Sequence, residues 1–153
     1  PVHLRCKDFL HYMLRLHGSK KTKAEIADAL QALDLDPEVL GKSVGKLSKG
    51  MTQKLGLVSC LLSDKRFMIL DEPMSGLDPK SRVLFKRSLA SLRERNLTLF
   101  FSSHVLTDVE ELSDTMAVLH KSRILYTGSS EAFIATNDSD NIEDAYMKSI
   151  ASG

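Results

Sequence analysis

The sequence predicts an α/β fold in which a mostly parallel sheet is flanked by helices and preceded by a helical subdomain. Two short apolar runs, 67–70 and 97–101, each end in polar residues and are typical of buried parallel strands. Apolar residues at helical spacing between them, Leu84, Phe85, Leu89 and Leu92, indicate a strand–helix–strand crossover. The 153 residues are 42% hydrophobic and 27% charged, which is the composition of one globular domain.

The first sixty residues predict three helices. The apolar residues expected to share one face of the first are Phe9, Tyr12, Met13 and Leu16. Those of the second are Ile26, Ala29, Leu30 and Leu33, and those of the third, which starts near 51, are Leu55, Val58 and Leu62. Thr22 and Glu25 form a capping box that starts the second helix, while Gly18 and Pro37 mark helix ends.

The C-terminal third predicts a further helix at 105–112 and two strands, 116–119 and 124–126, around a short polar turn. Two small helices, at 130–135 and 142–150, complete the pattern.

Charge and cysteine content exclude several classes of protein. The formal net charge is +1 and the basic cluster 20–23 is interrupted by Thr22, so DNA or RNA binding is not expected. Cys6 and Cys60 lack metal-ligand spacing and suit free thiols in the cytoplasm. No apolar run approaches the roughly 18 to 20 residues of a membrane span, so we expect membrane association through a partner. The start at Pro1 instead of methionine favours a fragment or a processed product.

Three polar residues follow the predicted strands at the edge where α/β sheets bind ligands. Asp71, Glu72 and His104 are therefore expected to converge. Asp71 is placed to hold Mg²⁺ directly or through water, and Glu72 to orient or deprotonate an attacking water. Pro73 predicts an extended backbone at Glu72. The alternative is that Asp-Glu-Pro only ends a strand and starts a turn.

Two more polar residues lie at expected helix starts. His104 could donate a hydrogen bond to a γ-phosphate during phosphoryl transfer, or could simply start a helix. Asp78 precedes Pro79 and predicts the N-cap of the next helix.

The segment Leu47-Ser48-Lys49-Gly50-Met51 places a hydroxyl, a glycine and amides at a helix start, which is a good anion site. Gly50 would let a phosphate approach the backbone closely. The alternative is a flexible loop with a serine cap.

The order and spacing of these pieces resemble the ATP-binding-cassette (ABC) family. The matching segments are Leu47-Ser48-Lys49-Gly50-Met51 (signature), Gln53-Lys54-Leu55, Phe67 to Pro73 (Walker B), Ser75-Gly76-Leu77-Asp78 (D-loop) and Ser103-His104 (switch histidine). The resemblance implies a P-loop NTPase-like fold from about residue 4 onward. Residues 4–62 would form the helical subdomain, and 63–153 the C-terminal part of the core.

By this resemblance the protein is an ATPase with ATP and Mg²⁺ as cofactors. Asp71 would position Mg²⁺, and Glu72 and His104 would be catalytic. Ser48 and Gly50, with Lys49 and Met51 of the same motif, would meet the γ-phosphate bound on an opposing subunit in a head-to-tail dimer. Asp78 would communicate across that dimer.

The same resemblance implies a place at the cytoplasmic face of the membrane. The helical subdomain would contact a transmembrane permease. Lys49 and Met51 depart from the commonest signature, Leu-Ser-Gly-Gly-Gln, and resemble an exporter-like branch.

The 153 residues contain no Walker A motif, Gly-x-x-x-x-Gly-Lys-Ser/Thr, which cradles the ATP phosphates. Gly41-Lys42-Ser43 has the right ending, but Asp36 occupies the first glycine position. In 45–52 both glycines are present, but Met51 occupies the lysine position. We therefore expect weak or no ATPase activity from this chain alone.

Three functions remain open: an energy-coupling subunit of a membrane transporter, a soluble cassette ATPase of DNA repair or translation, and a non-enzymatic partial cassette. The exporter-like signature and the lack of coiled-coil heptads or basic arms favour the first over the second. The carboxylate of Glu72 favours an enzyme over a binding module.

Overall fold

A computed structural model describes residues 2–93 and 97–151, and the side chains of residues 92 and 93 lie outside the description. The chain divides into two compact units, Pro1–Ser102 and Ser103–Gly153. The α/β fold class is confirmed, and within these described residues each unit contains one two-stranded sheet.

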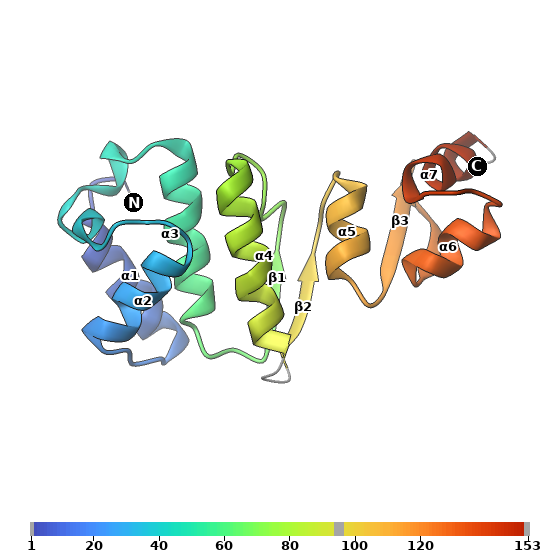
Figure 1. Cartoon of the computed structure of the whole chain (residues 1–153). Coiled ribbons are helices and arrows are strands. Elements are labelled where there is room, and N and C mark those ends of the chain that lie inside the picture. Colours follow the sequence, from blue (N-terminus) through green and yellow to red (C-terminus); the bar gives the residue numbers. More distant parts are fainter. Residues whose placement is uncertain (1, 94–96, 152–153) are drawn as a thin grey trace. The chain divides into compact units, whose positions relative to one another are not determined.

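The first unit begins with a group of helices (Figure 1). These are α1 (Cys6–His17), α2 (Lys23–Ala32), the 3₁₀ turns η1 (Pro37–Gly41) and η2 (Val44–Lys46), and α3 (Lys49–Leu61). Helix α3 contacts both α1 and α2. The buried side chains Leu55 and Val58 on α3 agree with the sequence prediction for that helix.

Local signals fix the ends of α1 and α2. The Thr22 side chain accepts a hydrogen bond from the Glu25 amide, and the Glu25 side chain accepts one from the Thr22 amide. The predicted capping box is therefore confirmed. Gly18 ends α1 in the left-handed conformation, with φ 70°, which a glycine adopts at little cost.

The predicted buried face of α1 is wrong. Tyr12 is 58% exposed and Leu16 is 66% exposed, whereas Cys6, Leu10 and Leu14 are buried. Residues four apart lie above one another on a helix, and α1 carries two such apolar rows. The row that packs against the other helices, Cys6, Leu10 and Leu14, is the buried one. The spacing of apolar residues alone does not determine which row this is.

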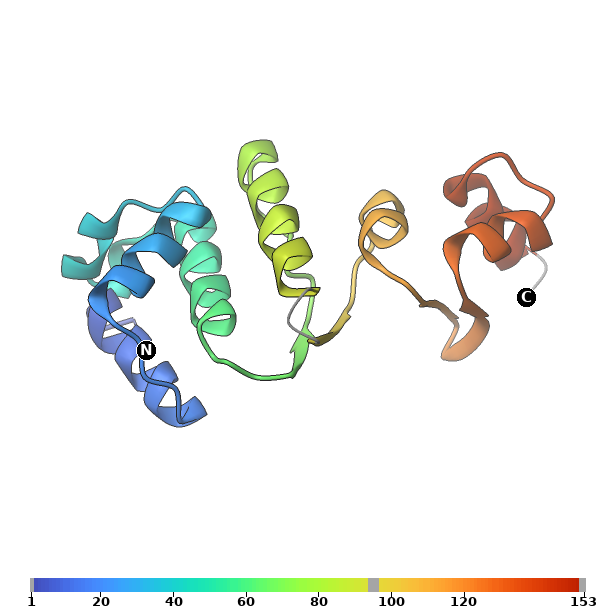
Figure 2. The ribbon, with the colours of Figure 1, turned by 60° about the horizontal axis from the view of Figure 1, so that its bottom comes forward.

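The rest of the first unit is the predicted crossover. Strand β1 (Phe67–Leu70), helix α4 (Pro79–Arg93) and strand β2 (Thr98–Phe101) follow in order, and β1 pairs with β2 in parallel from Phe67↔Thr98 to Leu70↔Phe101. Helix α4 runs alongside β1 in both ribbon views (Figures 1 and 2). Phe85 and Leu89 of α4 are buried, as predicted. Leu92, predicted on the same helical face, has a side chain outside the described residues.

One face of this sheet is exposed, and the prediction of fully buried strands is wrong. Phe67 is 58% exposed, Ile69 is 67% exposed and Phe100 is 63% exposed, while Met68 is buried. Side chains alternate between the two faces of a strand, so these three share one face. A continuous apolar run is typical of a strand covered on both sides, but the described residues cover only the Met68 side.

The second unit contains helix α5 (Leu106–Leu112), an antiparallel hairpin and two short helices. The hairpin strands are β3 (Met116–His120) and β4 (Arg123–Gly128), and the helices are α6 (Ser130–Thr136) and α7 (Ile142–Ala151). All four were predicted. Its buried core consists of Met116, Val118, Phe133, Ile142 and Ala145.

Across the described ranges, no helix combines the length and apolar character that a bilayer crossing requires.

A buried aromatic ring on α4 and an exposed one on β2 predict different costs for removing the ring. Phe85→Ala should lower the free energy of unfolding by about 3 to 5 kcal/mol, because the ring is fully buried and leaves a cavity. Phe100→Ala, at an exposed position, should cost less than about 1 kcal/mol. Urea unfolding of both variants measures the difference, and equal costs would contradict the described packing.

Candidate functional site

Parallel pairing of β1 and β2 places Asp71 beside Ser102. Leu70 and Phe101 are register partners, and each strand ends in a polar residue one position later. The Ser102 hydroxyl donates a hydrogen bond to Asp71 Oδ1 at 2.5 Å. The same hydroxyl oxygen accepts a hydrogen bond from the Glu72 amide at 2.9 Å. Ser102 therefore holds the backbone and a side chain of the acidic pair at the carboxyl edge of the sheet.

The backbone of Glu72 is left-handed, with φ 45°, so the predicted extended conformation is wrong. Its carbonyl accepts a hydrogen bond from the Ser75 amide at 3.0 Å, and its amide is held by Ser102. These two bonds turn the chain sharply after β1 and outweigh the local preference that Pro73 imposes. A left-handed residue other than glycine is uncommon and costs roughly 1 to 3 kcal/mol, and such residues cluster at functional sites.

The start of α3 has the predicted serine cap. The Ser48 hydroxyl accepts a hydrogen bond from the Met51 amide at 3.2 Å, and Ser48 is exposed. The amides of Lys49 and Gly50 lie in the first turn, where a helix offers no carbonyl partner. No acidic side chain lies in this turn to compete for them, so the helix start retains the electrostatic character of an anion site.

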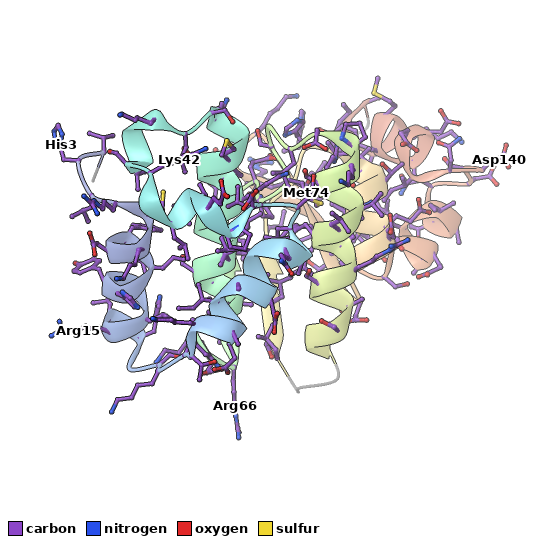
Figure 3. All side chains as sticks on the ribbon, turned by 60° about the vertical axis from the view of Figure 1, so that its left-hand side comes forward. His3, Arg15, Lys42, Arg66, Met74 and Asp140 are labelled. Atoms are coloured by element: carbon purple, nitrogen blue, oxygen red, sulfur yellow. The ribbon has the colours of Figure 1, made fainter. Side chains whose placement is uncertain are left out.

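The first two turns of α3 pack against residues 73–78, and we call this the helix–loop contact. Gln53 Nε2 donates a hydrogen bond to the carbonyl of Pro73 at 3.2 Å. A Cβ at Gly50 would lie 3.4 Å from the carbonyl oxygen of Gly76, so helix and loop meet backbone to backbone. Gly76 has φ 75°, which favours glycine. Met74, labelled in Figure 3, is buried in this loop.

Asp78 caps α4, as predicted. Its Oδ1 accepts a hydrogen bond from the Ser81 amide at 3.0 Å, and its Oδ2 accepts one from the Ser81 hydroxyl. These bonds, with a smaller contribution from the charge of Lys54, lower the pKa of Asp78 from 3.8 to about 2. The carboxylate is therefore ionised at any physiological pH.

The structure brings some of the predicted residues together in one unit. Asp71 and Glu72 share the loop that also contacts the helix bearing Ser48 and Gly50. His104 is exposed and belongs to the second unit. Its convergence with the acidic pair stays a prediction.

Sequence reasoning assigned no role to Ser102, Gln53 or Lys54. Ser102 could have been found from the strand register, because it directly follows β2 just as Asp71 directly follows β1. Lys54 is buried, which no sequence pattern indicated, since lysine is seldom buried.

The acidic edge fits a magnesium ion of the kind that bridges protein and phosphate. Groups of three or more His, Cys, Asp or Glu suited to a metal are absent from the described part of the chain. Mg²⁺ in nucleotide sites uses only one or two carboxylates, with water and phosphate oxygens as the other ligands. Exposed Asp71, with the hydroxyl of Ser102 against it, supplies oxygen donors of the required hardness.

Comparison with known proteins points to one family. The family model described as "ABC transporter" matches residues 3–75. ABC transporter ATP-binding protein NatA of Bacillus subtilis is 29% identical over 98% of this chain and 61% of its own length. Bacitracin transport ATP-binding protein BcrA of Bacillus licheniformis is 38% identical over 81% of this chain and 40% of its own length.

This chain is similar to ABC transporter ATP-binding proteins. Solved structures of ABC ATP-binding proteins share the fold of this chain. One, titled as an ATP-binding subunit of an ABC transporter, superposes with a TM-score of 0.87 over 98% of this chain at 22% identity, which shows the shared P-loop NTPase-like fold. A putative ABC transporter ATP-binding protein from Pyrococcus furiosus is 31% identical over 70% of the chain, with a TM-score of 0.60.

The chain spans less than two thirds of the length of each of these ABC proteins. It covers 61% of NatA, 40% of BcrA and 64% of the first solved structure.

The lowered pKa of Asp78 predicts a specific acid dependence of stability. A carboxylate with a depressed folded-state pKa stabilises the fold above its unfolded-state pKa of roughly 3.9, and this contribution disappears as pH falls toward the folded-state value. We expect the urea midpoints of wild type and Asp78→Asn to differ by a constant amount above about pH 5. The difference should narrow between about pH 4 and about pH 2, and a difference that persists unchanged at the lowest pH would contradict the assignment.

Proposed function

We propose that this chain is the C-terminal part of an energy-coupling ATPase subunit of a membrane ABC transporter. Two such subunits would dimerise head to tail around two ATP molecules and drive a membrane-embedded partner. The observation that carries the proposal is the helix–loop contact, which presents a serine-capped helix start and an acidic strand end from one compact unit. ABC transporter ATP-binding relatives support it.

Asp71 and Glu72 have separate tasks in this proposal. When bound, Mg²⁺ would supply positive charge against the phosphate oxygens, and Asp71 with Ser102 would hold it. Glu72 is half-buried, and its amide is fixed to Ser102, so its carboxylate projects from a constrained backbone. Glu72 would orient or deprotonate the attacking water. His104 would donate a hydrogen bond to the γ-phosphate.

The helix start and the loop would face the nucleotide held by the opposing subunit. Ser48 would donate its hydroxyl, and the first-turn amides of Lys49 and Gly50 would meet the γ-phosphate oxygens. Met51 lies one position further along and donates its amide to Ser48. Asp78, ionised and fixed to α4, would transmit the state of one nucleotide site to the other.

The partner would be a permease contacted through the helical part of the first unit, which places the chain at the cytoplasmic face of the membrane. Exposed apolar residues on α1, Tyr12 and Leu16, offer such a contact. The Ser-Lys-Gly-Met signature supports an exporter-like branch within the family.

The purified 153-residue chain should bind Mg-ATP poorly. Without a Walker A lysine and amide cradle, the β and γ phosphates lack their main counter-charge. Isothermal titration should show no saturable binding up to about 1 mM, which corresponds to less than about 4 kcal/mol of binding free energy. Tight Mg-ATP binding or brisk ATP turnover by this chain would contradict this prediction, because it would show that the chain holds the phosphates without a Walker A motif.

Glu72→Gln in the full-length gene product separates an ATPase from a scaffold. The amide cannot accept a proton, so the turnover number should fall by about 100-fold or more while ATP affinity stays within about threefold. The matched control is Glu143→Gln, an exposed position on α7, which should leave turnover unchanged. If the protein were only a binding module, neither substitution would change ATP turnover. That result would refute the ATPase proposal.

A further inference from the structure

A buried lysine on α3 lies among acidic groups from two other segments. Lys54 is 8% exposed. Its Nζ donates a hydrogen bond to the carbonyl of Asp34 at 3.2 Å, and lies 3.9 Å from Asp34 Oδ2 and 3.8 Å from Asp78 Oδ2. A buried ammonium needs such partners, because loss of water around an unpaired charge is costly. Lys54 therefore joins α3, the turn after α2 and the end of the loop before α4.

Asp78 does not need Lys54 to cap α4. Both of its carboxylate oxygens already accept hydrogen bonds from Ser81. Asp34 likewise has another cation, since Lys80 Nζ lies 2.7 Å from its Oδ1. What Lys54 adds is a tie between Asp78 and α3, the helix that begins at Ser48.

This tie completes the helix–loop contact along its length. Gly50 meets Gly76 in the first turn of α3, and Gln53 holds Pro73 in the second. Lys54 fixes the far end of the loop, at Asp78, to the same turn as Gln53. Three attachments on one helix restrict how the loop can tilt relative to the helix start.

We infer that Lys54 is a positioning residue that fixes Asp78 relative to the serine-capped start of α3. The inference rests on the proposed function for its consequence: helix start and Asp78 would meet the opposing subunit as one rigid surface, so hydrolysis at the nucleotide there would depend on Lys54. Lys54 itself would touch neither nucleotide nor metal.

Amide hydrogen exchange in the 153-residue chain tests the positioning without any ATPase activity. Lys54→Met keeps the length of the side chain and removes its charge, so it should free the loop. Exchange at the Ser75 and Leu77 amides, which bond to Glu72 and Met74, should accelerate by about tenfold. The matched control is Lys80→Met, because Lys80 bonds the same Asp34 and, among the described residues, only Lys54 forms an ion pair with Asp78. This control should leave both amides as in wild type.

If Lys54→Met does not fold, Asp78→Asn gives the same test, because it removes the partner charge while asparagine still caps the helix. Unchanged exchange at both amides in the folded variant would overturn the positioning role. So would an equal acceleration in Lys80→Met.

ATP turnover by the full-length gene product tests whether hydrolysis depends on Lys54. Lys54→Met should lower the turnover number by about tenfold with KM within about threefold, and Lys54→Arg, which restores the charge, should recover most of the loss. A merely structural role would move KM and turnover together and would not respond to arginine. If the wild-type product has no ATPase activity while the exchange result holds, the proposed function fails and the positioning of Asp78 stands.

Discussion

The parallel pairing of β1 with β2 is the constraint on which the acidic site depends. Two strands that end in register place the next residue of each side by side, and here those residues are Asp71 and Ser102. The hydroxyl of Ser102 bonds the Asp71 carboxylate and the Glu72 amide, so the turn that follows starts from a fixed point. A shift of the register by one residue would turn Ser102 to the opposite face and release both.

The loop after this turn then depends on a second helix for its shape. Left-handed residues at Glu72 and Gly76 make a compact course, and α3 holds it through Gln53 and the close approach at Gly50. Because all these contacts lie within one compact unit, the serine-capped helix start and the acidic edge form a single structural element.

The sequence predicted the elements well, because apolar spacing and caps are local properties. The strand β1, the crossover through α4 and the capping box at Thr22 were all predicted from neighbouring residues. The backbone at Glu72 was not, because hydrogen bonds to Ser102 and Ser75 override the local preference. The buried row of α1 was also missed, since that choice depends on where other helices pack. Burial of Lys54 has the same origin: it depends on acids 20 and 24 positions away along the chain.

The exposed side of the first sheet has a consequence for how the chain behaves outside an assembly. Phe67, Ile69 and Phe100 lie on one face of two strands that, among the described residues, pair only with each other. Exposed apolar side chains next to unpaired strand edges promote association with other polypeptides, including further copies of the same chain. In a cell, such a surface is recognised by chaperones and proteases unless a matching apolar layer covers it soon after synthesis. Replacing these three residues with polar ones would suppress this association. It would also remove the apolar surface against which a covering layer has to pack.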